Sequence, residues 1–267
     1  MRFEQQGHAE TLAIATVASG GHPHACVRSQ TLNFTTGATL RRWRRGACAV
    51  ALGSRGVGIN GSTSLLEVRS LDGARGDLQL FENLSLTIES GACLQVLGTN
   101  GGGKTTLLRI IAGLYSPERG AVRWRGASIH NNLDFRRAII YLGHDNGLKS
   151  DLSVAENLRA ASQLAGGRLL RDVDSALDEV GLSGFGPLRL GSLSAGQRRR
   201  VALARLAHEE ATLWILDEPF TALDERGVVL VRDLIRTHIR AQGAVIFTSH
   251  QGVGFETGEI QELALAS

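Results

Sequence analysis

No stretch of this sequence is long and apolar enough to cross a lipid bilayer, which takes about 18 consecutive apolar residues. The longest candidate near the front of the chain is Ala47–Leu52, which spans only six residues. Any work at a membrane would therefore depend on a partner that supplies the spanning segments.

Cysteine is scarce as well, with three residues in a chain of 267. Cys26, Cys48 and Cys93 are widely spaced and form no C-x-x-C pair. We expect reduced thiols, and we expect Cys93 to be a small hydrophobic residue of the core.

Acidic residues are nearly missing from residues 1–63, which hold seven arginines and two acids, whereas the rest of the chain holds 22 basic and 24 acidic residues. The basic character thus belongs to the front end and gives no support for a nucleic-acid surface on the folded body. The run Arg41–Arg45 fits a nucleic-acid patch, an anionic-lipid patch or an Arg-rich transit segment. Because sustained periodicity is absent up to Thr63, we expect residues 1–63 to be a disordered extension or the result of a start site assigned too far upstream.

Glycine, by contrast, is abundant, and one glycine-rich stretch predicts a phosphate loop. Residues 98–105 read GTNGGGKT and match G-x-x-x-x-G-K-[ST] at every fixed position, between an apolar run at 92–97 and a helical pattern at 107–112. Lys104 is expected to reach the β- and γ-phosphates of a nucleotide, and Thr105 to bind Mg²⁺. The alternative is a chance match in a glycine-rich chain, which the motifs downstream disfavour. The expected ATP-binding residues are Gly98, Thr99, Asn100, Gly101, Gly102, Gly103, Lys104, Thr105 and Thr106.

A second motif is the apolar run LWIL at 213–216, which ends in Asp217 and Glu218. A buried strand delivers such acids at its carboxyl end, where ligands bind in open α/β sheets. Neighbouring residues on a strand point to opposite sides, so the two carboxylates can serve different purposes. The alternative, a solvated strand end, is disfavoured because Pro219 and the sequence TALD at 221–224 follow.

The hydrophobic pattern after residue 63 predicts one α/β domain from 64 to 267. Strands are expected at 65–69, 84–88, 92–97, 121–124, 139–142, 213–216 and 244–248, and helices at about 153–166, 171–180, 196–208 and 226–241. Strands that alternate with helices favour a largely parallel sheet. The helical stretch from about 144 to 208 would form a second lobe.

The pentapeptide LSAGQ at 193–197, between the phosphate loop and LWILDEP, resembles the signature of the ATP-binding subunits of ABC transporters. The resemblance implies an ABC-type P-loop nucleotide-binding domain, with a RecA-like core and a helical subdomain. It also implies a homodimer, since the signature contacts ATP held by the other subunit. The signature residues are Leu193, Ser194, Ala195, Gly196 and Gln197.

The same resemblance implies roles for four further residues. Asp217 would organise Mg²⁺ through its ligand waters, and Glu218 would activate the attacking water. Asp224 would belong to the D-loop. His250 matches the switch histidine that contacts the γ-phosphate, although a lone histidine at a strand end is more often structural.

Residues 192–206 (SLSAGQRRRVALARL) and 212–224 (TLWILDEPFTALD) are similar to the ATP-binding subunits of the haem exporter of cytochrome c maturation, the CcmA family. His144 strengthens this resemblance, because most transporter ATPases have Gln there whereas this family has His. The resemblance implies ATP hydrolysis coupled to haem export, with His144 linking ATP state to the partner. It implies the membrane partners CcmB and CcmC, no nucleic acid, and a peripheral place at the cytoplasmic face of the bacterial inner membrane.

Two departures and two alternatives accompany this interpretation. The aromatic residue that usually stacks on adenine should lie near residues 75–77 and is missing, and Gly102 replaces the Ala common in the phosphate loop. One alternative is the ATPase of an ABC transporter for another substrate, such as a lipid, a metal or a small molecule. The other is a non-transport ABC protein, which would carry two cassettes or a long coiled-coil insertion.

Overall fold

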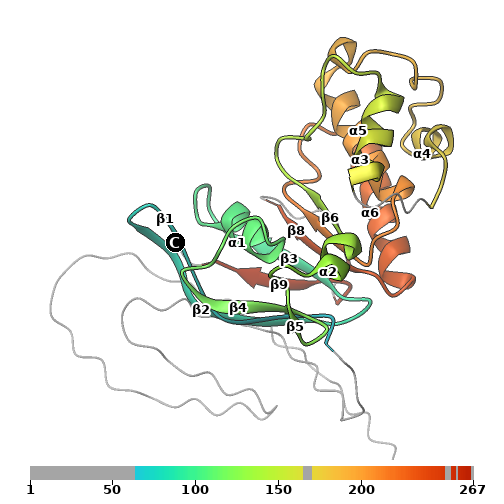
Figure 1. Ribbon diagram of the computed structural model, residues 1–267. Coiled ribbons are helices and arrows are strands. Elements are labelled where there is room, and N and C mark those ends of the chain that lie inside the picture. The colour runs from blue at the N-terminus through green and yellow to red at the C-terminus, as the bar shows by residue number, and fades with distance from the viewer. Residues whose placement is uncertain (1–63, 165–169, 250–253, 257, 266–267) are drawn as a thin grey trace, which may run out of the picture. The chain divides into compact units, whose positions relative to one another are not determined.

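The computed structural model describes residues 64–265 except 165–169, 250–253 and 257 (Figure 1). The segment 1–63 and His250 therefore lie outside the described residues. In chain order the elements are β1 (Leu66–Arg75), β2 (Leu78–Ile88), β3 (Cys93–Leu97), α1 (Lys104–Ile111), β4 (Arg119–Trp124), β5 (Ala127–Ser128), α2 (Leu133–Ala138), β6 (Ile139–Leu142), α3 (Val154–Leu164), α4 (Val173–Glu179), the 3-10 turn η1 (Leu190–Ser192), α5 (Ala195–His208), β7 (Leu213–Leu216), α6 (Glu225–Arg240), β8 (Ala244–Thr248) and β9 (Gln261–Ala264).

A parallel five-stranded sheet, in the order β6-β7-β8-β3-β9, forms the centre of the described domain. Every residue of β7 and β8 is buried, as is usual for parallel strands that are covered on both faces. The carboxyl ends of β3, β6, β7 and β8 lie at the same edge of this sheet. The predicted α/β fold class is confirmed, and this shared edge brings the phosphate loop and the LWILDEP segment together.

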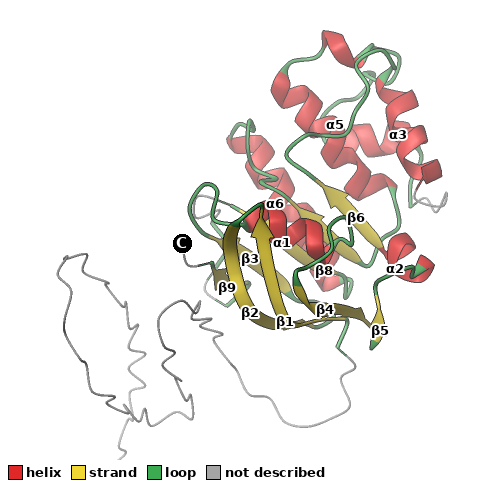
Figure 2. Cartoon of the chain, turned by 60° about the vertical axis from the view of Figure 1, so that its left-hand side comes forward, coloured by secondary structure: helices red, strands yellow, loops and turns green. Residues whose placement is uncertain are grey.

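A second sheet is antiparallel, in the order β2-β1-β4-β5 (Figure 2). The first two strands are longer than the sequence pattern predicts, because irregular registers carry β1 past Ser70 and Gly73. Ser70 has a φ of 45°, and the ring of Phe81 packs directly on Gly73, where a Cβ atom would clash. Helix α1 lies between the two sheets and shares one apolar core with both.

Helices α3, α4 and α5 pack on one another around a separate apolar cluster, to one side of the sheets (Figure 1). Helix α3 begins as predicted with a capping box, in which Ser153 and Glu156 exchange hydrogen bonds of 2.7 and 3.2 Å. Helix α2 and the strands β5 and β9 were missed by the sequence pattern. Helix α2 has only six residues, too few to display a helical period, although Asn132 caps it.

Candidate active site

The phosphate loop joins β3 to α1, as its strand and helix context requires. Gly103 caps the helix with a φ of 91° and without a side-chain hydrogen bond to the first turn. A Cβ atom at Gly103 would lie 2.9 Å from Leu80 Cβ, so only glycine lets the loop approach β2 this closely. The amide groups of the first turn are therefore left for an anionic ligand, which the positive end of the helix favours.

Lys104 is buried, and its ammonium group lies inside the loop. Nζ donates hydrogen bonds to the carbonyl oxygens of Gly98 at 2.7 Å and Thr99 at 2.9 Å. A lysine held over the concave side of the loop adds positive charge where the amide groups converge. This part of the chain is suited to bind the β- and γ-phosphates of a nucleotide.

Asp217 follows β7 and is fully buried, and two hydroxyl groups satisfy its carboxylate. Thr105 donates to Oδ2 at 2.8 Å, and Thr248, the last residue of β8, donates to Oδ1 at 2.8 Å. Hydroxyl and carboxylate oxygens are the hard ligands that Mg²⁺ prefers. Thr105 and Asp217 together fit a magnesium ion beside the phosphate loop.

Glu218 has an unusual backbone conformation, with a φ of 52° in the left-handed region. Such a conformation costs a non-glycine residue on the order of 1–3 kcal/mol and is concentrated at functional sites. The Glu218 amide donates to Thr248 Oγ1 at 2.8 Å, and the hydroxyl of Thr221 donates to Glu218 Oε2 at 3.3 Å. The sequence did not reveal Thr248, whose role comes from the pairing of β7 with β8.

A cavity of about 370 Å³ lies along the phosphate loop. Glu218 lines it, as do Arg75 and Leu80 from the β1–β2 region, Arg109 from α1 and Tyr115 from the turn after α1. The guanidinium group of Arg109 lies 5.4 Å from the ring centre of Tyr115. The aromatic ring of this cavity thus comes from the turn after α1, outside the region 75–77 where the family resemblance places an aromatic residue.

The signature residues open helix α5 and do not line this cavity of their own chain. Ser194 is the N-cap, and its backbone and side chain exchange hydrogen bonds of 2.9 and 3.2 Å with Gln197. Leu193 is buried, whereas Ser194 and Ala195 are exposed. The exposed start of α5 is available to a ligand that another molecule presents.

Two more predicted site residues lie next to element ends, one after β6 and one before α6. His144 follows β6, with its side chain 69% exposed and Nδ1 4.0 Å from a carboxylate oxygen of Asp145. Asp224 caps α6 and accepts a hydrogen bond from the Gly227 amide at 3.0 Å and one from Arg200 at 2.5 Å. Both bonds lower the pKa of Asp224, and the bond from the Gly227 amide has the larger effect. Arg200 therefore links the signature helix to Asp224.

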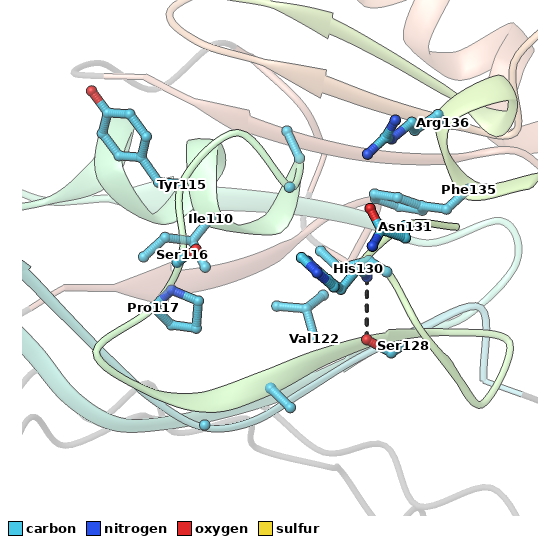
Figure 3. A pocket seen from close by; sticks show the side chains of 15 residues that line it. Ile110, Tyr115, Ser116, Pro117, Val122, Ser128, His130, Asn131, Phe135 and Arg136 are labelled. Atoms are coloured by element: carbon cyan, nitrogen blue, oxygen red, sulfur yellow. Dashed lines mark hydrogen bonds between the residues drawn. The ribbon is translucent and has the colours of Figure 1, made fainter. Parts of the chain in front are cut away.

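A second hollow, of about 210 Å³, lies between the end of α1, strand β4 and the start of α2 (Figure 3). Its wall combines apolar side chains such as Val122 and Phe135 with His130, Asn131 and Arg136. No carboxylate or lysine lines it, so it lacks both a carboxylate ligand for Mg²⁺ and the loop lysine. The cavity along the phosphate loop is the better candidate for nucleotide chemistry.

Comparisons with known proteins agree with this geometry. The model of the ABC transporter family matches residues 81–221. The chain is 46% identical over 208 residues to the cytochrome c biogenesis ATP-binding export protein CcmA of Methylococcus capsulatus, covering 77% of this chain and 100% of that protein. It is 45% identical over 203 residues to the protein of the same name from Dechloromonas aromatica, covering 75% and 100%.

Among solved structures, a putative ABC transporter ATP-binding protein from Pyrococcus furiosus is similar, with a TM-score of 0.65 and 29% identity. The match covers 75% of this chain and 96% of that one. Across the part of the chain that the structure describes, no helix has both the length and the apolar character that crossing a membrane requires.

Proposed function

The chain belongs to the CcmA family of ABC transporter ATP-binding proteins, and from this premise we propose that it is the ATP-hydrolysing subunit of the exporter that supplies haem for c-type cytochromes. The observation that carries the proposal is an identity of 46% along the full length of a cytochrome c biogenesis export protein. The Asp217–Glu218 pair beside the phosphate loop supports the ATPase activity.

In the proposed reaction, a water molecule attacks the γ-phosphorus of ATP while the bond to the β–γ bridging oxygen breaks. Glu218 accepts the proton of the water, and its backbone is held in position by Thr248. Lys104 and the amide groups at the start of α1 stabilise the negative charge that develops on the phosphates. Thr105 and Asp217 would hold Mg²⁺, which supplies additional neutralisation of the phosphate charge when bound.

The proposed working form is a homodimer bound to integral membrane subunits, CcmB with CcmC. Ser194 of one chain contacts the γ-phosphate of ATP that is bound to Lys104 of the other, which the exposed start of α5 permits. His144 and His250 sense the γ-phosphate, and His144 passes this state to the membrane subunits. The complex lies at the cytoplasmic face of the bacterial inner membrane.

Gene deletion with complementation tests this function. We expect the deletion strain to lose covalent haem from its periplasmic c-type cytochromes, the wild-type gene to restore it, and Glu218→Gln to fail despite equal protein levels. Haem staining of periplasmic extracts measures the outcome. Normal cytochrome maturation without the gene would remove the haem assignment and leave an ABC ATPase for another substrate.

A further inference from the structure

Arg199 lies on helix α5, five residues after Ser194, and its guanidinium group is buried, with 4% of the residue exposed. Nη1 donates to the carbonyl oxygen of Gly143 at 3.2 Å and to Asn146 Oδ1 at 2.7 Å. Nη2 donates to the carbonyl oxygens of Asp217 at 3.0 Å and Glu218 at 2.8 Å. One side chain thus connects the signature helix, the loop around His144 and the end of β7.

Burying this cation is energetically unfavourable, because all four acceptors are neutral carbonyl or amide oxygens. Burial lowers the pKa of Arg199, and the charges of Asp217 and Glu218 offset only part of that effect. A buried charge that is not bonded directly to a carboxylate lowers the stability of the fold. We therefore expect its hydrogen bonds to serve another purpose. The planar fork of arginine can bond two pairs of acceptors at once, which a lysine cannot do.

The positions of the four acceptors show which segments of the chain the guanidinium group of Arg199 holds in place. The carbonyl groups of Asp217 and Glu218 flank the left-handed backbone of Glu218, so two hydrogen bonds hold the conformation that orients its carboxylate. Gly143, through its carbonyl oxygen, and Asn146, through its side-chain Oδ1, flank the His144 segment. Loss of the fork would remove hydrogen bonds from both segments at once.

We propose that Arg199 is a positioning residue of the ATPase reaction, which orients Glu218 only when the His144 loop and the signature helix are both in place. The inference rests on the proposed ATPase function and adds a residue to it. Arg199 touches neither nucleotide nor water in this role, and it acts through the backbone of Glu218. Its loss should therefore slow turnover while leaving ATP binding nearly unchanged.

The test uses the full chain, purified with the membrane subunits that accompany it. For Arg199→Lys we expect kcat to fall about 100-fold, the cost typical of a misplaced catalytic group, with the KM for ATP within about threefold of wild type. Asn146→Ala removes one acceptor and leaves the arginine charged, so kcat should fall in the same direction by a smaller factor. In Arg199→Ala, added methylguanidinium should restore part of the activity.

Arg205 gives a matched control on the same helix. It donates two hydrogen bonds, of 2.7 and 3.1 Å, to the buried carboxylate of Glu209, away from the acceptors of Arg199. Arg205→Gln should lower the melting temperature without changing kcat. This comparison separates a loss of helix stability from a loss of positioning.

Two outcomes would contradict the inference, and they differ from failure of the proposed function. If wild type turns over, Glu218→Gln is inactive, and both Arg199→Lys and Asn146→Ala stay within twofold of the wild-type kcat, the positioning role is wrong. The role is also wrong if KM rises as much as kcat falls. If wild type does not hydrolyse ATP, the proposed function fails, and this inference with it.

Discussion

The hydroxyl group of Thr105 donates a hydrogen bond of 2.8 Å to Asp217 Oδ2, although the two residues are 112 positions apart in the chain. This bond joins the first turn of α1 to the end of β7, and it connects the two motifs that the sequence presents separately. Thr248 completes the arrangement, because its hydroxyl bonds Asp217 and accepts the amide hydrogen of Glu218.

Thr248 offers a sharp test of this network. Thr248→Val keeps the shape of the side chain but leaves a buried carboxylate oxygen and a backbone amide without their partner. We expect the free energy of unfolding to fall by about 1–3 kcal/mol, and kcat to fall with it. Urea denaturation and steady-state kinetics measure both effects. Thr248→Ser keeps the hydroxyl and should recover most of the loss; equal defects in the two variants would show that the hydrogen bonds of the hydroxyl do not account for the effect.

The composite site predicts complementation between two inactive variants. Lys104→Ala and Ser194→Ala should each abolish turnover, because the phosphate loop and the signature serve one nucleotide from different chains. In an equimolar mixture, half of the dimers formed at random should carry one intact site, and activity should reappear. Turnover should also depend on protein concentration. A mixture that remains inactive, with activity per chain independent of concentration, would contradict the dimeric site.

Binding of the adenine base should depend on Arg75, which lines the phosphate-loop cavity together with Leu80 and Tyr115. A guanidinium plane can stack on adenine as an aromatic ring does. We expect Arg75→Ala to raise the KM for ATP several-fold, about 1 kcal/mol of binding, with kcat unchanged. Arg119→Ala, outside the cavity, serves as the control and should leave the KM for ATP unchanged. Unchanged KM in Arg75→Ala would assign the base to another part of the cavity.

The sequence predicts those elements whose pattern is local. Strands β6, β7 and β8 have the predicted bounds because their apolar runs are continuous, and the phosphate loop can only stand between a strand and a helix. The long β1–β2 pair was predicted only in part, at 65–69 and 84–88, because its polar residues 70–75 pair through irregular registers that depend on the partner strand. Thr248 and Arg199 were missed for the same reason, since their acceptors come from segments distant in sequence.

The buried His238 predicts a pH-dependent stability. Its ring stacks on Trp214 with centroids 3.8 Å apart, and burial lowers its pKa from 6.5 to about 4. Between these values the unfolded chain binds a proton that the folded chain does not. The free energy of unfolding should therefore fall as the pH drops from 6.5 to 4, by up to about 3 kcal/mol. Denaturation at several pH values tests this, and His238→Phe should flatten the profile; an equal slope in both proteins would contradict it.

His144 provides the test that separates coupling from catalysis. Its imidazole is exposed at the end of β6, while the segment that carries it is held by Arg199 through Gly143 and Asn146. His144→Ala should leave the Kd for ATP unchanged and reduce partner-stimulated turnover about tenfold, within the range of ordinary coupling free energies. Haem attachment to c-type cytochromes should fall in proportion. Asp145→Ala, in the neighbouring and fully exposed position, should change neither. If His144→Ala lowered basal and stimulated turnover by the same factor, the histidine would belong to the hydrolysis step, and the link to the membrane subunits would have to lie elsewhere.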